Sequence, residues 1–208
     1  HLKRSLGNMD FLLNPTFTWM CLKGADFVFF QRPHLEDRIA AMRMCKNHNK
    51  PTWVDYDDNL HAVPMCNPRY PMYGNPQIQH NVAMMVAMAD VVTVSTAALR
   101  DSLLGILRSF PDGREFIRDP EKIVIIPNAY DEEMHGPIPE TRGERNKLVV
   151  WRGSGSHCKD LMLYTDALKN VVAARQDWNY EFIGEPFWWT IEELQKVAKP
   201  PVLGLTAT

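Results

Sequence analysis

The residues most suited to chemistry lie in the segment 147–160, which reads KLVVWRGSGSHCKD. An apolar, strand-like run stops at a turn of small residues, and a sequence compatible with a helix follows. Such a turn lets backbone N–H groups approach an anion closely, and the dipole of the next helix adds partial positive charge. The small residues are Gly153, Ser154, Gly155 and Ser156. The layout predicts a phosphate-binding loop.

Three nearby side chains could supply further donors or positive charge to the same anion. They are Arg152, His157 and Lys159. Arg152 ends the predicted strand, so it could equally point into packing or toward an acidic neighbour. The alternative interpretation of the whole segment is an ordinary strand-to-helix turn, with Ser156 as the helix N-cap.

A second group of candidates is acidic and follows the strand-like sequence TWVDY. Asp55, Asp57 and Asp58 lie where ligands collect at the carboxyl edge of an α/β sheet. Strand alternation would place Asp55 and Asp57 on one side and Asp58 on the other. Clustered carboxylates could bind a divalent metal or polarise a hydroxyl group, with Asp57 and Asp58 as the candidates for the second role, and Asp55 and Arg32 could face the same cleft. The alternatives are helix capping or a solvated turn for the aspartates, and a surface ion pair for Arg32.

The elements that must position these residues alternate between strand and helix. Strand-like runs are DFVFFQ (26–31), TWVDY (52–56), DVVTVS (90–95) and KIVII (122–126). Helical periods fill the intervals, at 34–48, 77–89 and 96–109. This alternation predicts a parallel, doubly wound sheet.

The periods stop after residue 127, in a segment rich in Pro, Gly and charge, and resume at Lys147. We expect a first Rossmann-like unit over residues 1–130, a linker over 131–146 and a partial second unit over 147–208. The second unit begins with the strand KLVVW and the small-residue turn. A helix over 157–175, a strand over 180–183 and a helix over 190–198 complete it.

Composition favours a packed, water-soluble protein. The 208 residues are 45% hydrophobic, and the formal net charge of −2 gives no basic stripe for nucleic acid or anionic membrane. Apolar runs are too short to span a membrane, and we expect a cytoplasmic protein. Cys21, Cys45, Cys66 and Cys158 lack CxxC spacing and disulfide-scaffold density, so we expect reduced, mostly buried thiols.

A family resemblance is carried by five segments in chain order: ADFVFFQRP, KPTWVDYDDNL, ADVVTVST, KIVIIPNAYD and RGSGSHCKDL. Their succession resembles the nucleotide-sugar-dependent glycosyltransferases of the GT-B fold, especially the family four-like group. The resemblance covers roughly residues 25–190. It implies two Rossmann-like domains, the first receiving the acceptor and the second holding the sugar nucleotide.

Carried over residue by residue, the resemblance places the diphosphate loop at 153–159. Lys159 lies near the usual phosphate-binding lysine, and Ser154 stands where an arginine is common. The form GSGSHCKDL resembles a variant of the loop that places His157 and Asp160 on family positions. The substrate implied is a nucleotide-diphosphate sugar, with no required cofactor or metal. The hydroxyl acceptor could be a glycan, lipid, protein or nucleic-acid base.

The resemblance also implies features that these residues do not contain. An opening strand with a Gly-rich turn would come before the first unit, and a pair of spaced glutamates would come after the second. We therefore expect a central fragment or a shortened relative. The leading hypothesis is a glycosyltransferase or part of one, and the alternative is a non-catalytic GT-B-like binding or structural protein. A dehydrogenase is disfavoured because no GxGxxG follows a strand.

Overall fold

The computed structural model describes residues 18–109, 120–137, 146–185 and 188–206. The chain divides into two compact units. The first comprises 1–61 with 76–128, and the second comprises 62–75 with 129–208. Each unit contains one parallel sheet, so the predicted α/β class with two parallel-sheet units is observed.

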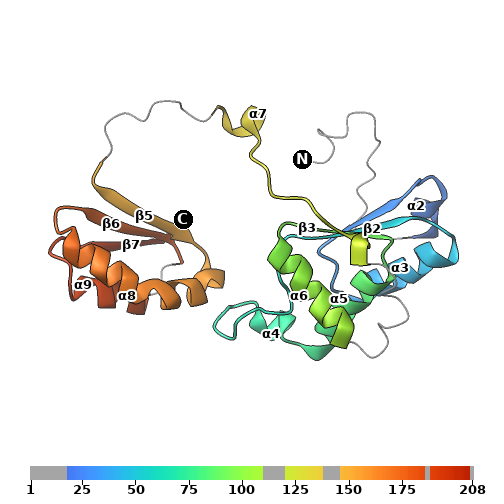
Figure 1. Cartoon of the computed structure of the whole chain (residues 1–208), viewed down its shortest axis with the longest axis horizontal. Helices are drawn as coiled ribbons and strands as arrows, with labels where there is room; N and C mark the ends of the chain where they lie inside the picture. The colour runs from blue at the N-terminus through green and yellow to red at the C-terminus, as the bar shows by residue number, and fades with distance from the viewer. Residues whose placement is uncertain (1–17, 110–119, 138–145, 186–187, 207–208) are drawn as a thin grey trace. The chain divides into compact units, whose positions relative to one another are not determined.

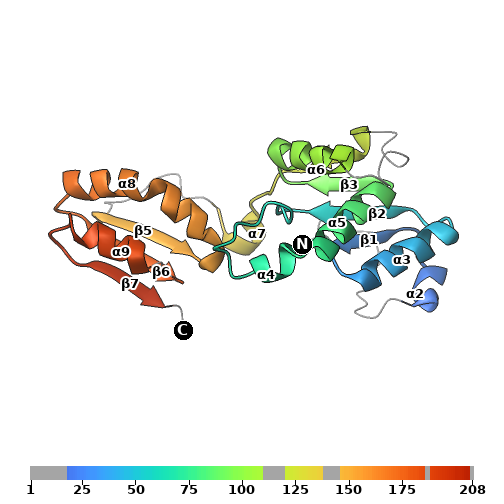
Figure 2. The ribbon, with the colours of Figure 1, turned by 90° about the horizontal axis from the view of Figure 1, so that it is seen from below.

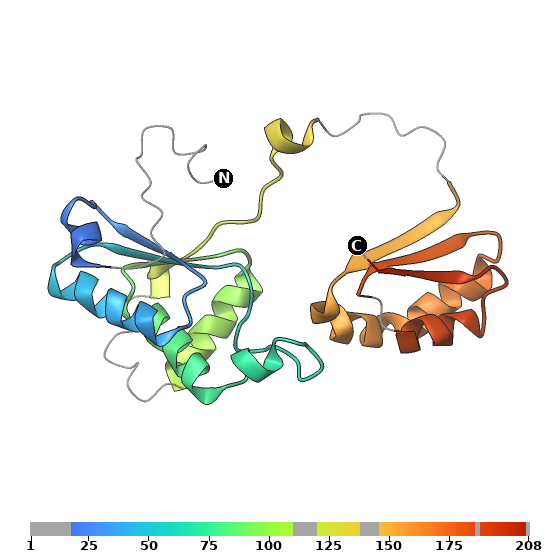
Figure 3. The same cartoon turned by 180° about the vertical axis from the view of Figure 1, so that it is seen from behind.

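The first unit has a four-stranded sheet whose strands follow one another in sequence order. The strands are β1 (Val28–Gln31), β2 (Thr52–Tyr56), β3 (Val91–Val94) and β4 (Ile123–Ile125). Their connections contain α3 (Glu36–Asn47), α5 (Pro76–Met88) and α6 (Ala97–Ser109), and the 3-10 turn η2 (Pro120–Lys122) precedes β4. Right-handed crossovers in sequential order put these helices on one face, as Figures 1 and 3 show.

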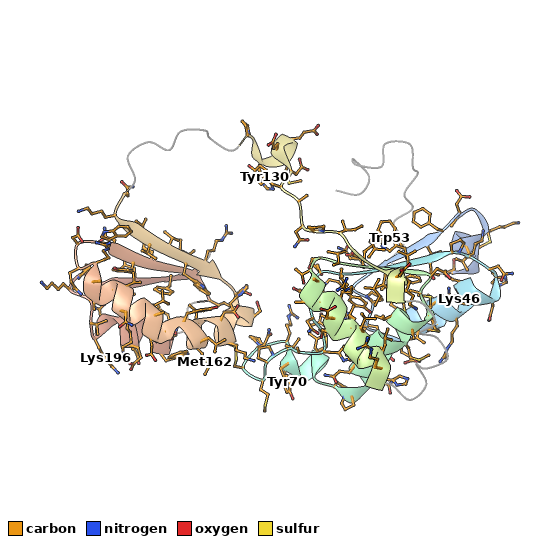
Figure 4. All side chains as sticks on the ribbon, in the orientation of Figure 1. Lys46, Trp53, Tyr70, Tyr130, Met162 and Lys196 are labelled. Atoms are coloured by element: carbon orange, nitrogen blue, oxygen red, sulfur yellow. A yellow bond between two sulfur atoms is a disulfide. The ribbon has the colours of Figure 1, made fainter. Side chains whose placement is uncertain are left out.

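The register of this sheet explains its core. Phe30, Val54, Val92 and Ile123 are aligned across the four strands and are all buried against the helices. The alternate residues project from the other face, where the ring of Trp53 meets the edge of Phe29 at a centroid distance of 4.9 Å. Figure 4 shows Trp53 on the side of the sheet away from the helices. Strand alternation therefore puts the buried apolar row against the helices, whereas the aromatic pair lies on the opposite face.

The expected double winding is not observed among the described strands. A doubly wound sheet reverses its strand order and carries helices on both faces, whereas β1 to β4 run in one direction. The order matches one half of such a sheet. Alternating periods predict parallel strands, but they contain no information about where the strand order reverses.

The second unit has a three-stranded parallel sheet of β5 (Leu148–Gly153), β6 (Asn179–Gly184) and β7 (Val202–Thr206). Helices α8 (Cys158–Ala174) and α9 (Trp188–Gln195) connect the strands. Figure 2, seen from below, shows both helices in front of these strands. The core between them consists of Leu161, Val172, Tyr180, Phe182, Ile191, Leu194 and Val202.

Apart from 3-10 turns, four elements of the described residues were not predicted from the sequence. Three are short helices, α2 (Trp19–Lys23), α4 (Tyr70–Tyr73) and α7 (Glu132–His135), and the fourth is β7. Helix α7 lies in the segment expected to be a linker, and its Met134 N–H donates to the capping carboxylate of Asp131 over 3.1 Å. Single-turn helices give too few residues for a period to be recognised.

Candidate functional site

The small-residue loop, residues 153–159, connects β5 to α8 through a 3-10 turn, η3 (Gly155–His157). Ser154 caps this turn, because its Oγ accepts a hydrogen bond from the Ser156 N–H at 3.4 Å and lies 2.6 Å from the Ser156 hydroxyl. The cap is thus Ser154 rather than Ser156, and His157 is the residue before α8. The turn ends where the dipole of a 17-residue helix begins.

Gly155 is buried at the centre of the loop, although its neighbours Ser154 and Ser156 are exposed. Its N–H donates to a carboxylate oxygen of Glu185, the residue that follows β6. A Cβ atom at Gly155 would lie 2.7 Å from that oxygen and 2.8 Å from Cγ of Pro68. A backbone N–H of the predicted phosphate loop therefore binds an anion, and that anion belongs to the protein itself.

The position of Glu185 is set by the preceding glycine. Gly184 has a φ of 111°, and a Cβ there would lie 2.2 Å from the carbonyl oxygen of Gly153. That carbonyl accepts a hydrogen bond from the Glu185 N–H at 3.0 Å. Only glycine fits this close approach, which brings the ends of β5 and β6 together and places Glu185 beside the loop.

The cationic candidates near the loop divide into two groups. His157 is engaged: its Nδ1 lies 3.0 Å from a carboxylate oxygen of Asp160, and its ring meets the edge of Trp151. Arg152 and Lys159 are exposed and form no ion pair with the described part of the chain. Because Trp151 packs against the core on the helix side, its neighbour Arg152 projects from the opposite face of the sheet.

One flank of the loop is covered by residues 62–75, here called the cover segment. Its place in the sequence lies between β2 and α5, so it was expected in the first unit, yet it belongs with the second. Asn67 Nδ2 donates to the Ser156 carbonyl at 3.4 Å, and Pro68 packs on Gly155. The segment also contains α4, whose Tyr70 is labelled in Figure 4.

A disulfide attaches the cover segment to the loop. Cys66 is bonded to Cys158, the first residue of α8, across 92 positions of sequence. The expectation of reduced thiols is therefore wrong for these two residues, because spacing arguments detect local pairs and not partners this distant. It is confirmed for Cys45, which is free and buried. Burial raises the pKa of the Cys45 thiol to about 11. The side chain of Cys21 lies outside the described residues.

The acidic candidates lie at the carboxyl edge of the first sheet, beside Arg32. The guanidinium pairs with both carboxylates: Nε lies 3.1 Å from Asp57 Oδ1, and a terminal nitrogen contacts Asp58. The Nε approach is an ion pair by distance but not a hydrogen bond. Asp57 and Asp58 thus share one partner rather than facing opposite sides. The alternation does not continue, because β2 ends at Tyr56.

Asp55 is placed differently from the other two aspartates. It lies within β2, in register with Thr93 of β3, and its Oδ1 accepts the Thr93 hydroxyl at 2.5 Å. Thr93 in turn accepts the indole N–H of Trp53 at 2.8 Å. These bonds tie neighbouring strands on the face away from the helices. The geometry gives Asp55 a structural role in the sheet.

Arg32 has a left-handed backbone, with a φ of 48°, which is unfavourable for a residue with a side chain. Three contacts hold it there. Its N–H donates to the Asp55 carbonyl at 2.8 Å, its own carbonyl lies 2.8 Å from His34 Nδ1, and the buried Tyr56 hydroxyl donates to the next carbonyl, of Pro33, at 2.6 Å. Burial raises the pKa of Tyr56 well above its ordinary value, so this hydroxyl remains a donor.

A pocket of about 270 Å³ opens beside the aspartates, and we call it the acidic pocket. Its lining residues are Asp57, Asp58, Asn59, Ser95, Thr96, Ala98 and Leu99. The ends of β2 and β3 and the start of α6 form it, which is where parallel sheets bind ligands. The Ser95 hydroxyl donates to the Asp57 carbonyl at 3.1 Å, and Thr96 caps α6 through the Leu99 N–H. Carboxylates, hydroxyls and an amide suit a hydroxylated ligand.

Sequence reasoning did not identify several of the residues that form these two sites. The loop is contacted from distant parts of the chain by Glu185, Pro68 and Asn67. At the first sheet, the Thr93 hydroxyl donates a hydrogen bond to the Asp55 carboxylate. The Thr93 partner was recoverable, since paired parallel strands place neighbouring residues side by side. The contacts of the cover segment give no local signal.

No protein-family model matches the chain, and no curated protein matches it. The functional assignment therefore depends on the residues and geometry described above. In the described part of the chain, no helix has the length and apolar character needed to cross a bilayer. Among the same residues, no group of three or more His, Cys, Asp or Glu side chains is arranged to hold a metal ion.

Proposed function

We propose that the protein is a glycosyltransferase, or part of one, which transfers a sugar from a nucleotide-diphosphate donor to a hydroxyl acceptor. The donor diphosphate binds the small-residue loop, and the acceptor hydroxyl binds the acidic pocket. The GT-B fold is part of this proposal. Each of the two units thus supplies one of the two binding sites that a transfer reaction requires.

The observation that carries the proposal is the anion already held by the loop. The Gly155 N–H, one residue into a tight turn before α8, is oriented so that it binds the carboxylate of Glu185. Backbone N–H groups and a helix dipole favour phosphate in the same way. Lys159 is exposed on the first turn of α8, where its ammonium group is free to reach the diphosphate.

The acidic pocket supports the acceptor half of the proposal. Asp57 and Asp58 are partly exposed, with 42% and 62% of their side chains accessible, so a hydroxyl group can reach them. In an inverting reaction one of these carboxylates takes the acceptor proton as the hydroxyl oxygen bonds to the sugar carbon. The bond from that carbon to the diphosphate oxygen breaks, and the loop stabilises the negative charge that develops there.

The test is calorimetric titration of the chain with uridine and guanosine diphosphates, comparing Lys159→Ala with Lys147→Ala. Both variants lose one lysine charge from the second unit, but Lys147 pairs with Asp177 at the other end of β5. We expect Lys159→Ala to weaken binding by about tenfold, the value of one charged hydrogen bond, and Lys147→Ala to leave it unchanged. Equal losses, or no binding by the unaltered chain, contradict the donor site.

The second candidate function is a non-catalytic GT-B-like binding or structural protein. The observation that favours it is again Glu185, since its carboxylate satisfies the Gly155 N–H and leaves the turn complete without a ligand. The two functions differ in chemistry. A non-catalytic protein neither transfers sugar to an acceptor nor slowly hydrolyses a nucleotide-diphosphate sugar, whereas a glycosyltransferase with both sites present releases nucleoside diphosphate.

A further inference from the structure

We propose that Glu185 is a displaceable internal anion: its carboxylate occupies the donor position of the small-residue loop and gives way to a diphosphate but not to a singly charged ligand. This inference rests on the proposed function, and it adds that Glu185 regulates which anions bind the same site. Glu185 lies outside the loop, and it shares the surroundings of Gly155 with Pro68.

Two groups enclose Gly155, and they differ in freedom to move. Pro68 is a rigid ring in the cover segment, which is fixed by the Cys66–Cys158 disulfide and by the Asn67 hydrogen bond to Ser156. Cys158 is 2% exposed and Asn67 is 9% exposed, so this flank is well packed. An anion cannot reach the N–H by moving Pro68 without unpacking the segment.

Glu185 forms the other flank and is free to leave. Its backbone is anchored by the N–H bond to the Gly153 carbonyl, but the residue is exposed and its carboxylate has no ion pair with a described residue. Rotation of its side chain would return the carboxylate to water and expose the Gly155 N–H without altering the backbone. Of the two groups, Glu185 is therefore the one that a ligand displaces from the Gly155 N–H.

The arrangement favours highly charged ligands. A tethered carboxylate acts at a high effective concentration, so a singly charged competitor that makes one equivalent hydrogen bond gains little over it. A diphosphate carries more charge and can contact several donors at once, among them the Gly155 N–H, the Ser154 and Ser156 hydroxyls and Lys159. Glu185 thus excludes carboxylates and similar anions from the loop.

The experiment compares Glu185→Gln with Glu192→Gln in the full chain. Glu192 is exposed on α9, so its substitution removes the same charge from the same unit without altering the loop. Inorganic pyrophosphate, uridine diphosphate and acetate are titrated by calorimetry. The Gly155 amide resonance is followed in ¹H–¹⁵N spectra, because its proton reports the acceptor directly. Glu185→Asp, with a shorter carboxylate, serves as a second variant should the glutamine variant fail to fold.

We expect Glu185→Gln to bind pyrophosphate and uridine diphosphate about tenfold more tightly than the unaltered chain, while Glu192→Gln does not. The Gly155 resonance should shift on substitution and again on pyrophosphate binding, and acetate should bind only the Glu185 variants. If the unaltered chain and Glu185→Gln bind uridine diphosphate equally well, the proposed competition by the Glu185 carboxylate is overturned and the proposed donor site remains. If neither binds pyrophosphate or uridine diphosphate, the donor site itself is overturned, and this inference with it.

Discussion

At the scale of the residue, both the local motif and the tertiary packing require a small residue at position 155, which Gly155 supplies. The motif needs a small residue so that the backbone can approach an anion. The packing needs one because a methyl group there would lie closer to Pro68 and Glu185 than van der Waals contact allows, at 2.8 Å and 2.7 Å. The two demands have different consequences for substitution, so the residue can be tested for each.

Gly155→Ala is expected to destabilise the second unit by about 1–3 kcal/mol, the usual effect of adding a methyl group to a packed position. Glu185 can move aside, but Pro68 is held by the disulfide. The control is Gly105→Ala on α6, where a Cβ meets nothing within 4 Å and alanine should stabilise the helix by about 1 kcal/mol. Thermal unfolding followed by circular dichroism measures both, and equal melting of Gly155→Ala and the unaltered chain would show that the contacts are not rigid.

Asp57→Asn and Asp58→Asn test the acceptor side. If one carboxylate is the general base, its replacement should lower sugar transfer about a hundredfold and leave nucleoside diphosphate affinity unchanged. Stability should change by less than about 1 kcal/mol, because the three side chains of these ion pairs are partly accessible to solvent, which screens their charges. Asp101→Asn, which removes an exposed pair with Arg100 on α6, is the matched control. Full turnover in both variants would remove these residues from the reaction.

At the scale of the element, strand-end polar residues show how far sequence patterns predict contacts. The buried strands and their helices follow from period alone, because β-branched and aromatic runs have few other ways to be buried. The directions of side chains just beyond the end of a strand cannot be predicted from this period. Asp57 and Asp58 lie outside β2, so the alternation that places Asp55 toward Thr93 gives no direction for them. Their shared partner, Arg32, follows β1 and has a left-handed backbone that strand alternation does not predict.

Asp90 links two strands and one helix and should make stability depend on pH. Its carboxylate accepts the Thr52 N–H and hydroxyl, each at 2.8 Å, and pairs with Lys46 of α3 at 2.6 Å. Burial raises the pKa of Asp90, but the hydrogen bonds from Lys46 and Thr52 outweigh burial and leave the pKa below its ordinary value. A lowered folded-state pKa contributes stability above the unfolded-state pKa, and this is lost as pH falls.

Asp90→Asn should therefore be less stable than the unaltered chain at pH 7, by about 1 kcal/mol since the carboxylate is half exposed. The difference should shrink as pH falls below about 4, where the native carboxylate also becomes protonated. Urea unfolding of the two proteins at pH 7, 5 and 3 measures this. A difference that stays constant across the series would mean that shape, and not charge, accounts for the role of Asp90.

At the scale of the whole molecule, the division of the chain was the least predictable feature. Composition locates a change near residue 128, because periodic sequence gives way to Pro, Gly and charge. It gives no sign that the cover segment leaves the unit that surrounds it in sequence and joins the other. That assignment depends on Cys66, Asn67 and Pro68 meeting residues about ninety positions away, which no local pattern encodes.

The last prediction follows from this connection. A protease recognition sequence inserted after Asn128 would let the chain be cut between the two stretches of sequence that contain Cys66 and Cys158. Because the disulfide joins them, the oxidised protein should remain one species on a non-reducing denaturing gel after complete cleavage, and it should separate into two fragments on reduction. Cys66→Ser, cut in the same way, should separate without reductant. Alkylation under denaturing conditions provides a second measure, with two more cysteines labelled after reduction than before. Two fragments from the oxidised, cleaved chain that retains both cysteines would show that the thiols are free, and the packing of Pro68 against Gly155 would then be held by non-covalent contacts alone.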